Sequence, residues 1–237
     1  AALSFLDFDF EKSAAMCRLA ADSKLTSNDL TLPIVSLMSG KKIRKFLHSM
    51  FGDSHLEDLW VNTYCVSANF SSASLKIHER GLTQLQVAAS MAIPGVFPPV
   101  IINKHLHIDG GVIDNLPVEA MYKKPVRHII AVSLSAEATT MVDLHEIPSS
   151  WQLFWSRVTN TTTYQLPGIS SILVNSITIN SRHRQESSKP NVSLFLELDL
   201  KEFKFLDWTN WQQLIEKGYQ QTKQKLADIT EEMQFWK

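Results

Sequence analysis

The chain has 237 residues, which is enough for one large domain with its own hydrophobic core. Hydrophobic residues make up 44% and charged residues 20% of the sequence, as in ordinary globular proteins. The formal net charge of -1 provides no general basic field for nucleic acid, and no apolar run reaches the roughly 20 residues that a membrane-spanning helix needs.

The first sixty residues predict two helices joined by an irregular segment. Residues 10–23 are good helix formers throughout, and residues 41–52 carry apolar side chains at helical spacing with lysine and arginine around them. Residues 30–40, between the two helices, are expected to be extended or looped around Pro33. The sequence LEDLW that follows favours a short helical turn.

Strand and helix patterns alternate over the middle of the chain. The run from 126 to 135 is apolar with polar ends and predicts a strand buried on both faces, as in a parallel sheet. Before it we expect strands over 61–70 and 74–80, a helix over 83–92, two short strands on either side of Asn103-Lys104, and a helix over 116–124.

The last hundred residues predict mainly helices. We expect helices over 149–160 and 169–185, a strand with clean alternation over 192–200, and a long closing helix over 208–233. Strands mixed with helices, including one buried apolar strand, are typical of a three-layer α/β fold. We therefore predict a single α/β domain spanning residues 1–237.

The two cysteines, Cys17 and Cys65, form no C-x-x-C pair, which argues against a disulfide scaffold or a zinc ribbon. We interpret them as two buried thiols in a reducing compartment. The expected localisation is therefore cytoplasmic.

The stretch HLHIDGG, residues 105–111, contains the most distinctive chemistry. His105, His107 and Asp109 are two residues apart, and on a strand this spacing points all three side chains to one face. Two imidazoles and a carboxylate on one face can hold a metal ion. The alternative is that only Asp109 takes part in a reaction, and that the two glycines after it form a tight turn that positions its side chain.

The wider sequence AASMAIPGVFPPVIINKHLHIDGGVIDNLPVEAM, residues 88–121, resembles the patatin-like phospholipase family. The pattern of that family is a helix ending A-S-x-x-x-P-x-x-F-P-P, two strands, D-G-G or D-G-A, and N-x-P opening a helix. The residues that match it here are Ala89, Ser90, Pro94, Phe97, Pro98, Pro99, Asp109, Gly110, Gly111, Asn115 and Pro117. The flanking sequences are similar to the branch that contains neuropathy target esterase.

The resemblance implies a three-layer fold with a mostly parallel central sheet and a serine esterase that uses a Ser–Asp dyad. Asp109 matches the dyad aspartate, and Gly110 and Gly111 match the turn that positions it. His105 and His107 match no catalytic role, so this interpretation favours the aspartate alone and implies neither a metal nor a cofactor. The implied substrate is a phospholipid or a lysophospholipid.

The nucleophile motif of that family, G-x-S-x-G, is absent from the sequence. Gly168-Ile169-Ser170 begins the pattern but lacks the closing glycine, and it follows the DGG instead of preceding it. We expect the chain to be the C-terminal part of an esterase domain, with the first strands, the oxyanion turn and the nucleophile elbow missing. The alternative is a catalytically dead paralogue that binds lipid or a protein partner.

Two segments suggest peripheral contact with a membrane. Residues 41–51 form a basic amphipathic helix of the type that lies on anionic membranes, although packing of its apolar face on the core is the more common arrangement. Trp151, Phe154 and Trp155 recur at helical spacing, which suits an acyl pocket or a lipid interface but is more often a core stripe.

Overall fold

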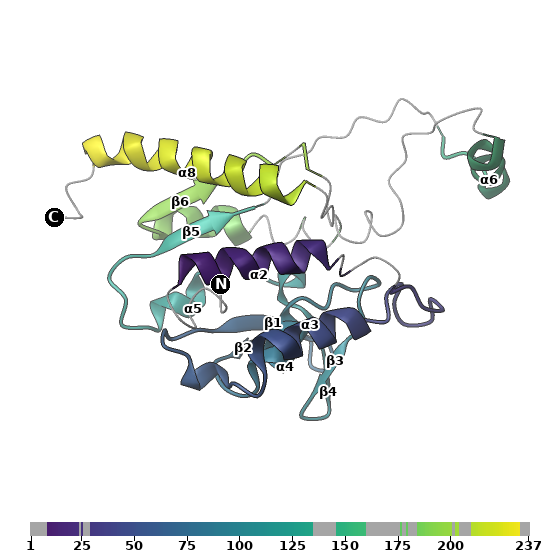
Figure 1. Ribbon diagram of the computed structural model, residues 1–237, viewed down its shortest axis with the longest axis horizontal. Helices are drawn as coiled ribbons and strands as arrows, with labels where there is room; N and C mark the ends of the chain where they lie inside the picture. Colours follow the sequence, from purple (N-terminus) through teal and green to yellow (C-terminus); the bar gives the residue numbers. More distant parts are fainter. Residues whose placement is uncertain are drawn as a thin grey trace.

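The computed structural model describes residues 9–23, 25, 29–134, 146–159, 176, 179, 184–200, 202–203 and 210–232. Within these residues the chain forms two β-sheets with helices around them, which confirms the predicted α/β class (Figure 1). The start of the chain, with Ala1-Ala2-Leu3, lies outside the described residues. So does the helix expected over 169–185, apart from residues 176, 179, 184 and 185.

The first two helices begin where the sequence predicts them. Helix α2 (Phe10–Asp22) is capped by Asp9, whose carboxylate accepts hydrogen bonds from the backbone N–H groups of Glu11 and Lys12 at 2.9 and 3.0 Å. Helix α3 (Lys41–Phe51) begins directly after a glycine with φ 69°. Between them, residues 30–38 form the expected loop.

The apolar face of α3 is part of the main hydrophobic cluster. Ile43, Leu47 and Phe51 are buried there together with Val96 and Phe97. The helix therefore packs on the core, as amphipathic surface helices usually do. Its apolar face is not available to a membrane, so the hypothesis that α3 lies on a membrane through this face is wrong.

The central sheet has four strands in the order β2-β1-β4-β3, and every pair in it is antiparallel. Asn103 and Lys104, with φ angles of 50° and 66°, form the tight turn between β3 and β4. The elements of this region in chain order are η1 (Leu56–Asp58), β1 (Cys65–Asn69), β2 (Ser74–His78), α4 (Thr83–Ser90), β3 (Val100–Ile102), β4 (His105–Asp109), η2 (Gly110–Val112) and α5 (Glu119–Tyr122).

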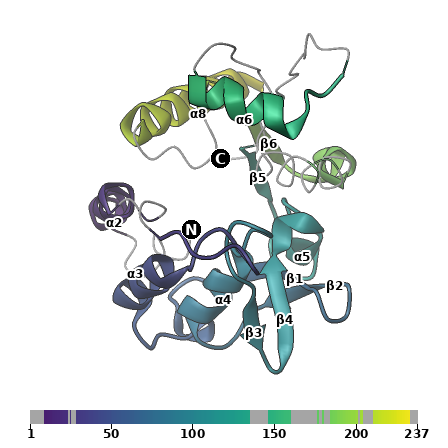
Figure 2. The same ribbon diagram turned by 90° about the vertical axis from the view of Figure 1, so that its right-hand side faces the viewer.

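The predominance of antiparallel pairs differs from the mostly parallel sheet that the resemblance implied. Short hairpin connections join β1 to β2 and β3 to β4, and such connections allow only antiparallel pairing. The described strands pair in parallel only in the second sheet, between β5 (Ile130–Ser133) and β6 (Leu194–Glu197), which a long connection joins. Figure 2 shows this sheet beside α8, on the far side of the molecule from α3 and α4.

Strand β5 is not buried on both faces, so that prediction is wrong. Ala131 and Ser133 are buried, whereas Ile130 and Val132 are 51% and 44% exposed. The described elements cover only one face of this sheet. An apolar run alone therefore did not reveal how many faces of the strand are packed.

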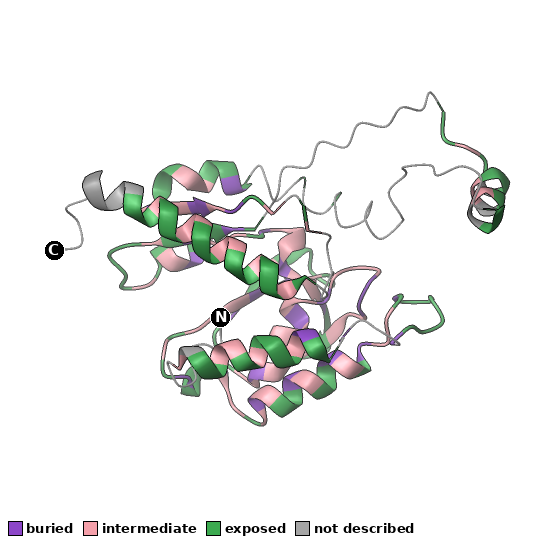
Figure 3. Ribbon diagram, turned by 45° about the horizontal axis from the view of Figure 1, so that its top comes forward, coloured by how far each residue is buried: buried purple, intermediate pink, exposed green. Residues whose placement is uncertain are grey.

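In the described residues after 146, the structure has α6 (Ser150–Thr159), η3 (Lys189–Asn191), β6 and α8 (Trp211–Glu232). Trp151 and Trp155 on α6 are 72% and 55% exposed, so these two residues do not form a core stripe. Helix α8 has no buried side chain over residues 211–227 (Figure 3). No helix in the described ranges is long and apolar enough to cross a bilayer.

The two cysteines differ from each other in their surroundings. Cys17 is exposed on α2, which corrects the prediction that both thiols are buried. Cys65 is partly buried on β1, and burial raises the pKa of its thiol to about 12.

A buried polar network holds three strands of the central sheet together. The hydroxyl of Ser67 on β1 lies 2.7 Å from Nε2 of His78 on β2 and 2.7 Å from Nδ1 of His107 on β4. Ser67 is fully buried, and the two histidines are 4% and 3% exposed. The hydroxyl has only one proton to donate, so at least one imidazole must donate to it.

Both imidazoles of this network are held neutral. Burial and the neighbouring His107 lower the pKa of His78 from 6.5 to about 4, and burial also lowers the pKa of His107. Protonation of either ring in this site therefore costs folding free energy.

We predict that His78 contributes a loss of stability as the pH falls from 6.5 to about 4, because the unfolded state binds a proton at His78 in this range and the folded state does not. Since water partly screens this site, the contribution is at most roughly 3 kcal/mol of unfolding free energy. Urea denaturation at a series of pH values measures it.

His78→Gln should flatten this pH dependence, whereas His48→Gln, which changes an exposed histidine of α3, should leave it unchanged. Equal slopes in the wild type and His78→Gln would contradict the assignment.

Candidate active site

Asp109 is the last residue of β4, and its backbone is fixed from two sides. It pairs with Ser67 in the antiparallel register of β1 and β4, and its backbone N–H donates to the carbonyl of Ala92 at 2.9 Å. Ala92 follows α4, so this helix and the central sheet jointly set the position of the aspartate.

The carboxylate of Asp109 caps the short helix η2 that follows. Its Oδ1 accepts a hydrogen bond from the backbone N–H of Gly111 at 2.7 Å. Burial raises the pKa of Asp109 above its ordinary value of 3.8, and the bond from Gly111 lowers it to a smaller extent. A partly buried carboxylate of this kind accepts a proton more readily than an exposed one.

The two glycines have different steric roles. A Cβ at Gly110 would lie 2.5 Å from the carbonyl oxygen of Val66 on β1, closer than real Cβ contacts allow. A Cβ at Gly111 would lie 3.1 Å from Oδ1 of Asp109 and 3.2 Å from Oδ1 of Asn115, and would crowd the carboxylate. The turn therefore requires glycine at 110 for close backbone approach, and glycine at 111 leaves space around the aspartate.

The two histidines of HLHIDGG have separate environments. His105 is exposed near the β3–β4 turn, whereas His107 is buried and bonded to Ser67. Within the described residues, no three His, Cys, Asp or Glu side chains are grouped so that they could hold a metal ion.

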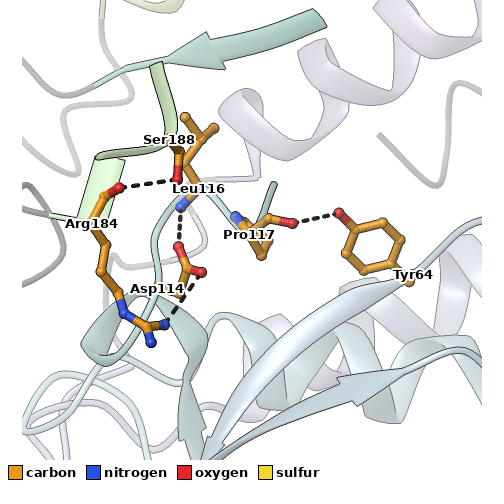
Figure 4. Close-up of polar contacts among 6 residues, drawn as sticks. All are labelled: Tyr64, Asp114, Leu116, Pro117, Arg184 and Ser188. Atoms are coloured by element: carbon orange, nitrogen blue, oxygen red, sulfur yellow. Dashed lines mark hydrogen bonds and ion pairs between the residues drawn. The ribbon is translucent and has the colours of Figure 1, made fainter. Parts of the chain in front are cut away.

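Asp114 is a buried carboxylate that the sequence reasoning did not single out (Figure 4). It accepts a hydrogen bond from the backbone N–H of Leu116 at 3.1 Å, and its Oδ2 lies 3.6 Å from the guanidinium of Arg184. Burial raises its pKa, and the bond from Leu116 and the charge of Arg184 lower it to a smaller extent. The sequence signal for Asp114 was a single charged residue in the mainly apolar stretch GGVIDNLPV.

These contacts fix the segment that follows the DGG turn. Asp114 donates its own backbone N–H to the carbonyl of Gly110 at 2.9 Å. The hydroxyl of Tyr64 donates to the carbonyl of Pro117 at 2.9 Å (Figure 4). Burial raises the pKa of Tyr64, so its phenol stays a donor. Arg184 thus connects a distant part of the chain to the candidate site.

A groove of about 420 Å³ lies beside this segment, between the β1–β2 hairpin and α5. Its lining is Ala73, Leu75, Ile77, Ile113, Asp114, Pro117, Glu119, Ala120, Lys123 and Arg184. Asp109 is not part of this lining, because its side chain shares the sheet face of Ser67, opposite to that of Leu75 and Ile77.

Comparison with known proteins points to one family. The sequence model of the family described as "Patatin-like phospholipase" matches residues 1–122, which include the DGG turn and most of the central region. This match covers more than half of the chain.

Several curated relatives are similar over most of this chain. Lysophospholipase NTE1 of Candida albicans is 28% identical over 203 residues, which are 84% of this chain and 15% of the relative. Lysophospholipase NTE1 of Meyerozyma guilliermondii is 30% identical, over 81% of this chain and 14% of the relative. Neuropathy target esterase sws of Drosophila melanogaster is 29% identical, also over 81% of this chain and 14% of the relative. The chain thus spans about one seventh of the length of these relatives.

We predict that Gly110→Ala destabilises the fold by roughly 1–3 kcal/mol, because the added methyl meets the rigid backbone of β1. Urea denaturation measures the change. Gly218→Ala on α8 is the matched control, since the nearest atom to its Cβ is 3.8 Å away and alanine favours a helix. A Gly110→Ala protein as stable as this control would disprove the steric argument.

Proposed function

The chain belongs to the patatin-like phospholipase family, and on this basis we propose that it carries the catalytic aspartate of a lipid acyl hydrolase. The proposed substrate is a phospholipid or lysophospholipid, from which the enzyme releases a fatty acid. The relatives named lysophospholipase and neuropathy target esterase support this class of reaction. The observation that carries the proposal is the environment of Asp109, a partly buried carboxylate that two glycines hold at a strand end.

In the proposed mechanism, Asp109 is the general base of a Ser–Asp dyad. It takes the proton of a serine hydroxyl as the serine oxygen attacks the ester carbonyl, and returns it to the departing alcohol. Water then attacks the acyl-serine ester and gives a proton to Asp109. Asp109 passes this proton to the departing serine oxygen, so that the fatty acid is released and the serine hydroxyl and the ionised aspartate are restored.

The serine of this dyad is not in the present sequence, because no G-x-S-x-G occurs in its 237 residues. We propose that another part of the same protein supplies it. The fixed backbone of Asp109 supports this role, because a base must be held in place to meet an incoming nucleophile.

Substitution of Asp109 tests the proposal. Asp109→Asn in the full-length protein should lower kcat/KM for a lysophospholipid by several orders of magnitude, because the amide cannot accept the proton. Asp58→Asn is the matched control, since that carboxylate is 72% exposed on η1. Activity of Asp109→Asn within a few-fold of the control would refute the dyad assignment.

The same variant should not lose stability. Burial raises the folded pKa of Asp109, so the associated stability is present below pH 3.8 and is lost as the pH rises through the folded pKa. The amide never ionises and can still accept the bond from Gly111. We therefore expect the melting temperature of Asp109→Asn at neutral pH to be equal to or above that of the wild type.

The nucleophile is tested separately by labelling the full-length protein with a fluorophosphonate and sequencing the labelled peptide. A single adduct on a serine within G-x-S-x-G supports the serine esterase. A folded protein that takes no label would contradict it and favour a lipid-binding paralogue without catalysis.

The pH dependence of the reaction gives a further prediction. Asp109 must be ionised to act as a base, so kcat/KM should fall on the acid side through a pKa above 3.8, the ordinary value for aspartate. Steady-state kinetics at a series of pH values measures this limb. If kcat/KM fell with a pKa at or below 3.8, the group that controls the reaction would be a residue other than the buried Asp109.

A further inference from the structure

An apolar loop between α2 and α3 exposes several large hydrophobic side chains. Leu30, Leu32, Ile34 and Val35 are 75%, 73%, 80% and 65% exposed. In Figures 1 and 3 the loop projects beyond the N-terminal end of α3. Single exposed apolar residues are common on proteins, but four in one short loop indicate an interaction surface.

The loop has a fixed base, so its exposure is part of the fold. Leu30 and Met38 form an antiparallel bridge, and the backbone N–H of Thr31 donates to the carbonyl of Leu37 at 3.0 Å. The buried hydroxyl of Ser36 donates to the carbonyl of Met38 at 2.7 Å. These bonds hold the apolar side chains outward on a closed loop.

Basic residues lie directly beside the loop. Lys41, Arg44 and Lys45 are exposed on the first turns of α3. From residue 30 to residue 52 the sequence contains four lysines and arginines and no aspartate or glutamate, whereas the whole chain has a net charge of -1. Positive charge is therefore concentrated beside the apolar loop.

An apolar tip beside a cluster of cations is complementary to one kind of surface, a bilayer with anionic headgroups. The hydrocarbon interior accepts the aliphatic side chains, and the phosphates attract lysine at the interface. Since the apolar face of α3 is buried in the core, the loop and not the helix presents the aliphatic surface.

The loop is also connected to Asp109 through one short segment. The backbone N–H groups of Leu37 and Met38 donate to the carbonyls of Gly95 and Val96, both at 2.9 Å. In the same segment, the carbonyl of Ala92 accepts the N–H of Asp109 at 2.9 Å. A loop fixed on a membrane would therefore hold the aspartate near that membrane.

We propose that residues 30–37, the docking loop, insert into anionic phospholipid bilayers while Lys41 and Lys45 contact the headgroups. This inference goes beyond the proposed hydrolysis, because the docking surface binds lipid whether or not Asp109 is catalytic. The partner of the exposed loop in this proposal is a lipid bilayer and not a protein.

Flotation with phospholipid vesicles tests the proposal. The full-length protein carries Asp109→Asn in every sample so that no substrate is consumed. Binding should be stronger to phosphatidylcholine vesicles containing phosphatidylserine than to phosphatidylcholine alone, and added salt should weaken this difference. Equal binding to both vesicles would overturn the role of the basic residues.

Ile34→Ser should lower the vesicle partition coefficient by roughly ten-fold, because one large aliphatic side chain no longer enters the bilayer. Ile147→Ser is the matched control, since both isoleucines are 80% exposed. An equal decrease in the two variants, or none in Ile34→Ser, would overturn the proposal.

The double variant Lys41→Gln/Lys45→Gln separates charge from insertion. It should reduce binding to the anionic vesicles by roughly 30-fold and leave binding to phosphatidylcholine unchanged. An equal loss on both vesicles would show that the substitutions act on the fold instead of on headgroup contact, and would overturn this part.

A second measurement does not depend on loss of binding. Leu32→Trp should gain tryptophan emission that brominated lipid quenches, because the ring lies among the acyl chains. A variant that binds vesicles without this quenching would overturn insertion. The protein could also fail to bind vesicles and form dimers that Ile34→Ser dissociates. In that case the loop is a protein interface, and the proposal is wrong.

Discussion

The contact on which this structure depends is the close approach of Gly110 to the backbone of β1. No side chain fits between residue 110 and the carbonyl of Val66, so the chain can turn sharply at the end of β4 only with glycine there. This turn places the carboxylate of Asp109 against the N–H of Gly111 and starts the segment that Asp114 and Tyr64 hold in place. The geometry of the candidate site follows from one steric requirement.

The sheet face that carries Asp109 is unusually polar for a buried surface. Ser67 lies opposite Asp109 in the strand register, and the two imidazoles bonded to Ser67 are neutral. A buried polar network stabilises a fold only when its members are hydrogen-bonded, and it then permits one arrangement of the strands. His78 and His107 thus help to fix the strands through Ser67. They take no part in the proposed proton transfer, which is the role of Asp109.

The segment between α4 and β3 connects Asp109 to the docking loop. Its carbonyl at Ala92 holds Asp109, and its carbonyls at Gly95 and Val96 hold the base of the docking loop. Val96 is also part of the buried cluster beneath α3, which makes the segment a firm support. Such a connection suits the proposed hydrolysis, because a lipid that leaves the bilayer at the loop would lie close to Asp109.

The sequence by itself determined the elements and the family. Local signals placed α2, α3, α4 and the β3–β4 hairpin, because helix caps, apolar spacing and turn residues act over a few positions. The pattern around residues 88–121 identified Asp109, Gly110 and Gly111 as a unit. Only the tertiary structure decided which residues meet. It separated His105 from His107, brought Asp114 to Arg184, and left one face of β5 uncovered, because these outcomes depend on packing between segments far apart in the chain.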